Sequence, residues 1–278
     1  MQPLISPSRF RSLEGPVCLL DARRARAYAG GHLPGALCAD LERDLSTACA
    51  SGQDPASGGR HPLPSAAAWA LRLGAWGVRP GLPVVAYDDA SGGNAASRLW
   101  WMLRAAGHRP SAVLDGGLQA ALGEGYVLTQ EARTVESLQP YPFTAWGLPT
   151  VDLEGAARWA QEGSRKLLDV RSAERYRGET EPLDPVAGHI PGALNLPYPN
   201  NLGPDGRFKD PKQLREMYLA LLDGTPPERL AVHCGSGVTA CHTLLALEAA
   251  GLPGAALYVG SWSEWCRSGR EIAQGERP

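Results

Sequence analysis

The sequence predicts an α/β fold made of two tandem domains, each with a mostly parallel open sheet flanked by helices. Short apolar runs alternate along the chain with longer stretches rich in Ala and Leu, which is the pattern of successive β-α units. The order of these segments repeats in the two halves of the chain. The length of 278 residues suits two domains, because one domain averages about 150 residues.

Four landmarks occur in the same order in each half of the sequence. Those of the first half are Leu19-Leu20-Asp21-Ala22-Arg23, Gly31-His32-Leu33-Pro34-Gly35-Ala36, Val84-Val85-Ala86-Tyr87-Asp88 and Val113-Leu114-Asp115-Gly116-Gly117-Leu118. Those of the second half are Leu167-Leu168-Asp169-Val170-Arg171, Gly188-His189-Ile190-Pro191-Gly192-Ala193, Leu230-Ala231-Val232-His233-Cys234 and Leu257-Tyr258-Val259-Gly260-Ser261-Trp262. Such self-similarity indicates a duplicated domain, in which Asp88 corresponds to Cys234.

The expected elements follow from local composition. Apolar runs bounded by Gly, Pro and Asp predict buried strands at 17–20, 84–87, 113–114, 167–170, 230–233 and 256–259. Ala- and Leu-rich stretches predict helices at 66–73, 95–106, 214–222 and 239–249. Ligands of such sheets bind beyond the carboxyl ends of the strands.

The domain boundaries are predicted from breaks in this pattern. Three prolines interrupt 136–149, which is interpreted as a linker between domains at 1–135 and 150–278. A stretch rich in Gly, Ser and Ala at 49–59 has no counterpart in the second half and is interpreted as an insertion.

Composition excludes several classes of partner. The formal net charge of −2 favours neither nucleic acid nor an anionic membrane surface. No run approaches the ~18 apolar residues of a membrane-spanning helix, and the start of the chain lacks the pattern of a signal peptide. A cytoplasmic protein is therefore expected.

The cysteines do not form a recognisable framework. The chain has six, at positions 18, 38, 49, 234, 241 and 266, too scattered for a disulfide scaffold and without the spacing of a zinc site. Core packing is expected for most of them, including Cys241 and Cys266. No metal and no organic cofactor is expected.

Cys234 has a different setting, in the segment Cys234-Gly235-Ser236-Gly237-Val238-Thr239. The segment connects a predicted buried strand to a predicted helix and contains two glycines. Such a loop can curl so that backbone N–H groups face inward, and the helix adds its positive N-terminal end. Such a field stabilises a thiolate or the terminal sulfur of a persulfide. Cys234 is therefore the expected nucleophile, with the alternative of a buried cysteine before a helix.

This loop resembles the active loop of the two-domain rhodanese family, and most closely its 3-mercaptopyruvate sulfurtransferase variant. The resemblance extends over nearly the whole chain. It includes Gly188-His189-Ile190-Pro191-Gly192-Ala193, Trp100-Trp101 and Gly260-Ser261-Trp262-Ser263-Glu264-Trp265. It implies a catalytic second domain and a non-catalytic first domain that has lost its cysteine, consistent with Asp88 in the corresponding position.

The resemblance also implies several substrate-binding residues. Arg175 matches the family arginine that reaches the active cysteine, the alternative being a surface ion pair with Glu174 or Glu179. Residues Gly235, Ser236, Gly237, Val238 and Thr239 would form the substrate loop, and His61 fits the histidine that pairs with the loop serine. Leu183 stands where mercaptopyruvate enzymes usually carry a second arginine.

The implied activity is sulfur transfer from 3-mercaptopyruvate, or from thiosulfate, through a persulfide on Cys234 to a thiol, a thioredoxin-like protein or cyanide. One alternative is an enzyme that prefers thiosulfate, and another is a persulfide carrier with little turnover of small donors. A cysteine phosphatase is a third, less favoured alternative. It needs an arginine to clamp the phosphoryl group at the sixth residue after the cysteine, where this chain has Ala240.

Overall fold

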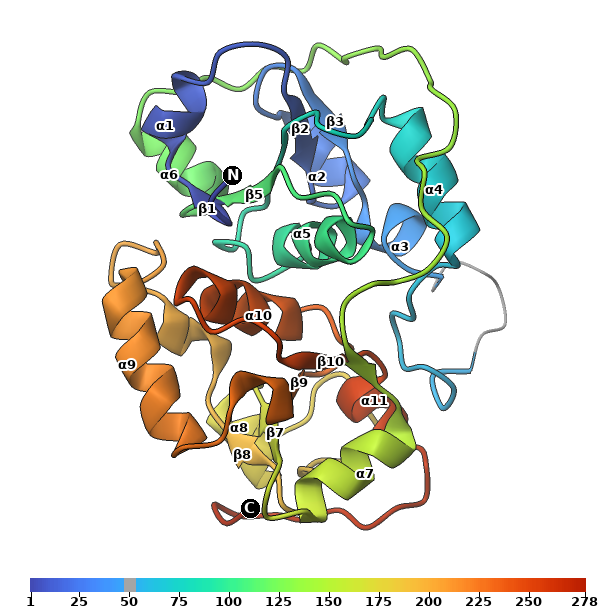
Figure 1. Ribbon diagram of the computed structural model, residues 1–278, viewed down its shortest axis with the longest axis vertical. Coiled ribbons are helices and arrows are strands. Elements are labelled where there is room, and N and C mark those ends of the chain that lie inside the picture. The colour runs from blue at the N-terminus through green and yellow to red at the C-terminus, as the bar shows by residue number, and fades with distance from the viewer. Residues whose placement is uncertain (48–53) are drawn as a thin grey trace. The chain divides into compact units, whose positions relative to one another are not determined.

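The chain forms two units, seen in a computed structural model that describes residues 1–47 and 54–278 (Figure 1). The first unit consists of Met1–Cys49, Leu63–Gly147 and Gly203–Phe208, and the second of Ala50–Pro62, Leu148–Leu202 and Lys209–Pro278. Each unit thus combines most of one sequence half with a short segment of the other. Cys49 and residues 50–53 of the expected insertion lie outside the described residues.

The first unit contains a five-stranded sheet with the order β1-β5-β4-β2-β3. Its strands are β1 (Leu4–Ile5), β2 (Cys18–Asp21), β3 (Ala36–Cys38), β4 (Val84–Tyr87) and β5 (Ser111–Leu114), and all their pairings are parallel. Its helices are α1 (Pro7–Arg11), α2 (Ala25–Gly30), α3 (Leu41–Asp44), α4 (Ala66–Ala75), α5 (Ala96–Ala105) and α6 (Gly117–Gly123).

The second unit has the corresponding strand order, β6-β10-β9-β7-β8, again with parallel pairings throughout. Its strands are β6 (Thr150–Val151), β7 (Lys166–Asp169), β8 (Leu194–Asn195), β9 (Leu230–His233) and β10 (Ala256–Tyr258). Its helices are α7 (Leu153–Gln161), α8 (Ala173–Arg177), α9 (Pro211–Leu222), α10 (Ala240–Ala249) and α11 (Ser261–Trp265), with 3-10 turns η1 (Tyr198–Asn201) and η2 (Pro227–Arg229).

Local sequence accounts for the start of several helices. Asp210 accepts hydrogen bonds from the first turn of α9 in a capping box with Gln213, and Pro211 occupies the first helical position. Ser65 caps α4 and Asp152 caps α7, each by accepting one hydrogen bond from an N–H of the first turn. These side chains satisfy backbone N–H groups that have no partner within the helix.

The second unit's core forms where helices cover the parallel strands. Helix α7 packs against β6 and β7, and α10 packs against β9 and β10. Leu167, Ile190 and Tyr258 are fully buried there, together with Trp262 of α11. Strand β9 lies between β10 and β7, so the residue that follows it emerges from the middle of the sheet.

The predicted α/β class and the two parallel sheets are confirmed. Within the described residues the sheets are wholly parallel, and the antiparallel contacts are isolated bridges at His32 and His189. Each of these two histidines stacks on a tyrosine, Tyr28 or Tyr176, and contacts that tyrosine's backbone carbonyl through Nδ1. Their recurrence in both halves therefore reflects a shared structural role.

Candidate functional site

Cys234 follows β9 directly and opens the loop that leads into α10. Its side chain is only 3% exposed. Its carbonyl accepts a hydrogen bond from the N–H of Trp262 at 3.0 Å, and its own N–H donates to the Ser261 hydroxyl at 3.2 Å. The start of α11 thereby holds the cysteine backbone from the adjacent β10 side of the sheet.

The loop is tightly packed at Gly237. This glycine has a φ of +72°, and a Cβ there would lie 2.4 Å from the Val259 carbonyl oxygen. Only glycine fits this position without displacing backbone. Ser263 donates its N–H to the Gly235 carbonyl at 2.9 Å, which fixes the other side of the loop.

Several loop N–H groups remain available to an anion. Within the described chain, the N–H groups of Gly235, Ser236, Val238 and Thr239 donate to no protein acceptor. Val238 is buried and Thr239 half-buried, immediately before α10. The loop therefore combines a buried sulfur with unsatisfied backbone donors, as a cradle for negative charge requires.

Ser236 and His61 form a hydrogen-bonded pair. The Ser236 hydroxyl and the His61 Nδ1 are 2.7 Å apart, and both residues are buried. His61 belongs to the 54–62 segment, which is part of the second unit. Gly58 anchors this segment by donating its N–H to the Glu264 carboxylate at 2.8 Å. The structure thus brings the sequence-predicted histidine and serine together.

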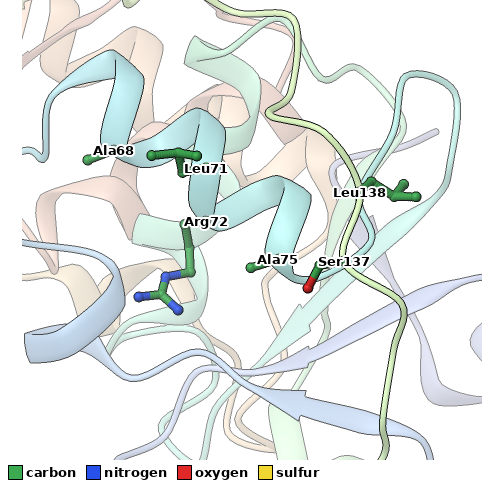
Figure 2. Close-up of a pocket in the computed structure, with 6 residues that line it drawn as sticks. All are labelled: Ala68, Leu71, Arg72, Ala75, Ser137 and Leu138. Atoms are coloured by element: carbon green, nitrogen blue, oxygen red, sulfur yellow. The ribbon is translucent and has the colours of Figure 1, made fainter.

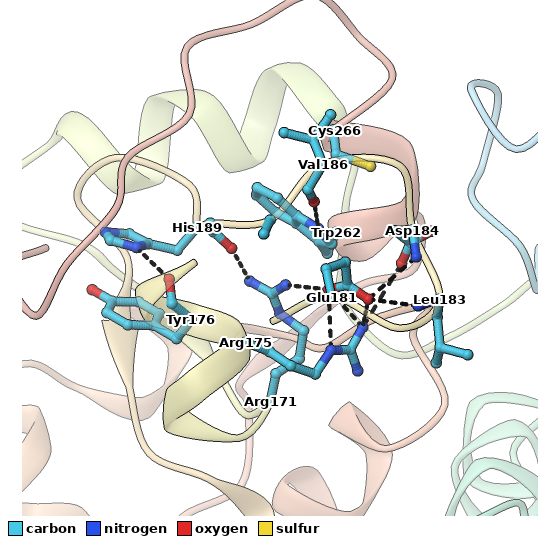
Figure 3. Close-up of polar contacts among 12 residues, drawn as sticks. Arg171, Arg175, Tyr176, Glu181, Leu183, Asp184, Val186, His189, Trp262 and Cys266 are labelled. Atoms are coloured by element: carbon cyan, nitrogen blue, oxygen red, sulfur yellow. Dashed lines mark hydrogen bonds and ion pairs between the residues drawn. The ribbon is translucent and has the colours of Figure 1, made fainter. Parts of the chain in front are cut away.

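Arg175 lies on α8 and is held by a buried carboxylate (Figure 3). Its Nη2 is 2.7 Å from Glu181 Oε1, and Glu181 also contacts Arg171 Nη1 at 3.2 Å. Arg175 thus pairs with Glu181 rather than with Glu174 or Glu179, and Glu179 pairs with Arg177. Glu181 orients Arg175 toward the loop rather than leaving it in solvent.

Arg171 ends one of the repeated landmarks, and its side chain is buried in an ion pair with Asp169 of the same landmark. Its guanidinium contacts Asp169 at 2.6 Å and lies 4.4 Å from the Trp262 ring centre. Burial lowers the pKa of Arg171, but Asp169, Glu181 and the Cys234 thiolate together raise it above its ordinary value. Arg171 is therefore a fixed cation whose field reaches the cysteine.

Arg60 is a site residue that the sequence analysis missed. A Cβ placed on Gly235 would lie 3.1 Å from Arg60 Nη2 and 3.4 Å from Arg175 Nη2, so both guanidinium groups lie beside the cysteine loop. Asp184 holds Arg60 through its Nε and Nη2, at 3.2 and 3.3 Å. The only available signal was its position next to His61.

The side chain of Leu183 is exposed, and Figure 3 shows it pointing away from the guanidinium group of Arg175. Its backbone N–H donates to the Glu181 carboxylate at 3.1 Å. Two other arginines that could take the place of the missing cation are already paired, Arg177 with Glu179 and Arg207 with Glu124.

The first unit has a different group at the corresponding position. Asp88 follows β4 and is fully buried. Its two carboxylate oxygens accept hydrogen bonds from four backbone N–H groups, those of Ala90, Gly92, Asn94 and Ala96. Here the loop donors are satisfied by the protein's own carboxylate.

Other features of the described chain do not compete with this site. A pocket of about 520 Å³ lies beside α4 in the first unit, lined by Ala68, Leu71, Arg72, Ala75, Ser137 and Leu138 (Figure 2). No cysteine or histidine is among these lining residues. Across residues 1–47 and 54–278, no three His, Cys, Asp or Glu side chains are grouped to hold a metal ion. No helix in these residues is both long and apolar enough to cross a membrane.

Comparison with known proteins identifies relatives of both halves. Residues 9–124 and 153–268 each match the Rhodanese-like domain. A probable 3-mercaptopyruvate sulfurtransferase of Pseudomonas aeruginosa is 48% identical over 91% of this chain and 87% of its own length. Thiosulfate sulfurtransferase of Bos taurus is 39% identical over 87% of this chain and 80% of its own.

A solved structure is also similar. The 3-mercaptopyruvate sulfurtransferase from Leishmania major superimposes with a TM-score of 0.80 and 29% sequence identity, covering 95% of this chain and 74% of that one. The similarity includes both repeats, in agreement with the duplicated strand order.

Proposed function

The chain belongs to the rhodanese family of sulfurtransferases, and we propose that it transfers sulfur from 3-mercaptopyruvate through a persulfide on Cys234. The observation that carries this proposal is the loop between β9 and α10. It combines a buried cysteine, backbone donors without protein acceptors and a Ser236–His61 hydrogen bond. The similarity to sulfurtransferases named for this donor supports the same choice.

The first half-reaction begins with attack of the Cys234 thiolate on the sulfur of the donor. The S–S bond forms as the donor's C–S bond breaks, and the bonding electrons pass to the donor's C3 as the enolate of pyruvate. The proton of the donor thiol is then needed at C3. Ser236 and His61, 2.7 Å apart, supply a hydroxyl and an imidazole that can relay it. The products are pyruvate and a Cys234 persulfide anion.

The loop stabilises the persulfide by its charge distribution. The terminal sulfur carries negative charge, and the donors at Gly235, Ser236, Val238 and Thr239 stabilise it without reorganisation. In the second half-reaction a thiol, a thioredoxin-like protein or cyanide attacks this sulfur and releases the Cys234 thiolate. No step needs a metal or an organic cofactor.

We place this activity in the cytoplasm. All five cysteines in the described residues are free thiols, which suits a reducing compartment. A low-molecular-weight or protein thiol is available there as the acceptor of sulfur.

A steady-state assay tests the proposal with 3-mercaptopyruvate, thiosulfate and an aryl phosphate as substrates. We expect kcat/KM for 3-mercaptopyruvate to exceed that for thiosulfate by about tenfold or more, equivalent to ~1.4 kcal/mol of differential transition-state binding. The reason is that the Ser236–His61 pair can relay the proton that the pyruvate enolate needs, whereas sulfite leaves thiosulfate without such a transfer and gains no charge of its own from Gly235 or Ser236. A preference for thiosulfate would make the protein a thiosulfate sulfurtransferase. Slow turnover of both donors would favour a persulfide carrier.

A further inference from the structure

His233, the last residue of β9, has a ring nitrogen without a hydrogen-bond partner among the described residues. The side chain is fully buried, and its Nε2 is bonded to no protein group there. Nε2 is 3.8 Å from Asp169 Oδ2, which is too long for a direct hydrogen bond. The N–H of Ile190, also fully buried, donates to no acceptor in the described chain. Buried polar groups without partners are uncommon, so both need an explanation.

The first unit shows which atom satisfies the corresponding groups. There Tyr87, the last residue of β4, stands where the second unit has His233. The Tyr87 hydroxyl donates to Asp21 Oδ2 at 2.7 Å and accepts the Leu33 N–H at 3.0 Å. One oxygen atom thus serves both a buried carboxylate and a buried backbone donor.

The surroundings of these groups match in the two units. The registers of the sheets pair Asp169 with His233, and the corresponding aspartate of the first unit with Tyr87. In each unit this aspartate binds the arginine two residues further on, at 2.6 Å. That arginine donates to the carbonyl of the glycine two residues before Leu33 or Ile190, at 2.6 and 2.7 Å. The Ile190 N–H therefore corresponds in position to the Leu33 N–H.

An imidazole is shorter than a phenol, so His233 carries no atom that corresponds to the Tyr87 hydroxyl. A water molecule can supply the oxygen. It would accept the Ile190 N–H and donate its two hydrogens to Asp169 Oδ2 and His233 Nε2. Two atoms 3.8 Å apart can share one water at ordinary hydrogen-bond lengths of about 2.8 Å. Three partners are typical of a buried water.

We infer that the second unit binds one buried water molecule between His233, Asp169 and Ile190, and that this water holds His233 as the neutral tautomer with its proton on Nδ1. Burial lowers the pKa of His233 in spite of the nearby carboxylate, which agrees with a neutral ring. The inference does not depend on the identity of the sulfur donor, because it rests on groups of the sheet and on their counterparts in the first unit.

This tautomer affects the loop of Cys234. Nδ1 of His233 is 3.3 Å from the Cys234 carbonyl, which also accepts the Trp262 N–H. With its proton on Nδ1, the ring donates to that carbonyl. The N–H of a trans peptide points opposite to its C=O, so the Gly235 N–H is directed away from His233 and Trp262. His233 is thus a positioning residue for the first backbone donor of the loop.

Two measurements on the full-length wild-type protein test the water site. A crystal structure that resolves ordered water should show an oxygen within hydrogen-bond distance of His233 Nε2, Asp169 Oδ2 and the Ile190 nitrogen. ¹⁵N NMR of labelled histidine should show a proton on Nδ1 of His233, and the loss of this signal in a His233 variant assigns it. A direct hydrogen bond from Nε2 to Asp169, or a proton on Nε2, overturns the inference.

Substitutions at position 233 test the same site by stability. His233→Tyr brings in the hydroxyl that the first unit uses, so we expect it to displace the water and to keep Tm close to that of wild type. His233→Phe removes one partner of the water, and Tm should fall by several degrees. Tyr87→Phe is the matched control in the first unit and should lower Tm as well. Equal Tm values of His233→Phe and wild type would contradict the water site.

The pH profile of Cys234 alkylation by iodoacetamide tests the positioning role. Both His233 variants lack the Nδ1 donor, and we expect them to lower the rate near neutral pH about threefold, because a less fixed Gly235 N–H stabilises the thiolate less. Tyr87→Phe should leave the profile unchanged although it lowers Tm. An unchanged profile in both His233 variants would overturn the positioning role.

Discussion

Cys234 differs from the other described cysteines in the groups around its sulfur. Burial raises the pKa of Cys18 to about 11 and also raises the pKa values of Cys38 and Cys266, which keeps these thiols protonated near neutral pH. Cys241 lies within α10, where its Sγ contacts the Gly237 carbonyl at 3.5 Å. Cys234 alone among them opens a loop with unsatisfied backbone donors.

Replacement of Cys234 by Ser should abolish sulfur transfer with little change in Tm. The hydroxyl is nearly isosteric with the thiol but forms no persulfide, and the backbone bonds to Ser261 and Trp262 are retained. Cys38→Ser is the control, since this half-buried thiol lies in the first unit, and should keep most of the activity. Residual turnover in Cys234→Ser above a few per cent would mean that another residue is the nucleophile.

Arg175→Ala should raise the KM for 3-mercaptopyruvate by up to ~100-fold, as expected for loss of a charge-assisted pair worth about 2–3 kcal/mol. Glu181 keeps Arg171 as a partner in this variant, so the carboxylate is not left unpaired. Arg177→Ala, two residues further along α8, removes an exposed pair and should leave KM unchanged. Equal effects of the two substitutions would contradict direct binding by Arg175.

At the scale of residues, the sequence predicted the loop members and Arg175 but not Arg60. The loop is contiguous, so a strand, two glycines and a helix identify it locally. Arg60 looks like any surface arginine in the sequence, and its proximity to Gly235 follows only from the hydrogen bonds of its segment to Ser263 and Glu264.

At the scale of elements, the two units have corresponding strand-to-helix loops that differ in the side chain at the first position. In the second unit the loop begins with Cys234, and the N–H groups of Gly235, Ser236, Val238 and Thr239 have no protein acceptor among the described residues. In the first unit the loop begins with Asp88, whose carboxylate accepts hydrogen bonds from three N–H groups of the loop and from that of Ala96, the first residue of α5. The first unit therefore retains the anion cradle but fills it with a side chain.

Asp88→Ala should destabilise the first unit by about 2 kcal/mol or more, because buried N–H donors lose their acceptor. For a chain of this size that loss corresponds to a fall in Tm of several degrees, measurable by calorimetry. Asp89→Ala is the matched control, since this neighbouring side chain is exposed and should change Tm little. Equal stability of Asp88→Ala and wild type would show that water replaces the carboxylate without cost.

The prediction of elements succeeded where the segments are long or fully buried. Strands β4 and β9 and helices α4, α5 and α10 lie within a few residues of their predicted bounds. The edge strands β1, β3, β6 and β8 were missed, because each has only two or three residues and no period can be recognised in so short a run. Their backbone pairing is determined by the neighbouring strand instead.

At the scale of the whole molecule, the second unit is discontinuous in sequence. It includes the 54–62 segment, which supplies Arg60 and His61 to the Cys234 loop. Most of the rest of this unit follows residue 148. A catalytic domain defined by sequence halves alone would therefore lack two residues of the proposed site.

A fragment of residues 148–278 should consequently lose nearly all turnover of 3-mercaptopyruvate. It retains Cys234 and Arg175 but lacks the Ser236 partner His61 and the hydrogen bonds from Gly58 and Arg60 to α11. The measurement is kcat/KM of the purified fragment, with circular dichroism to establish that its secondary structure is present. A folded fragment as active as the full chain would refute any need for the 54–62 segment.

The sequence by itself determined the duplicated α/β architecture, the parallel sheets and the loop that carries Cys234. These features depend on residues close together in the chain. The spacing of apolar residues, the positions of glycines and the order of strands and helices can be recognised there from the sequence alone. Only the tertiary structure decided the surroundings of that loop. His61 and Ser236 are 175 residues apart, and Arg60 meets Gly235 across a similar interval, so no local pattern relates them. Their contact arises from long-range packing and hydrogen bonds, which join residues regardless of their separation along the chain.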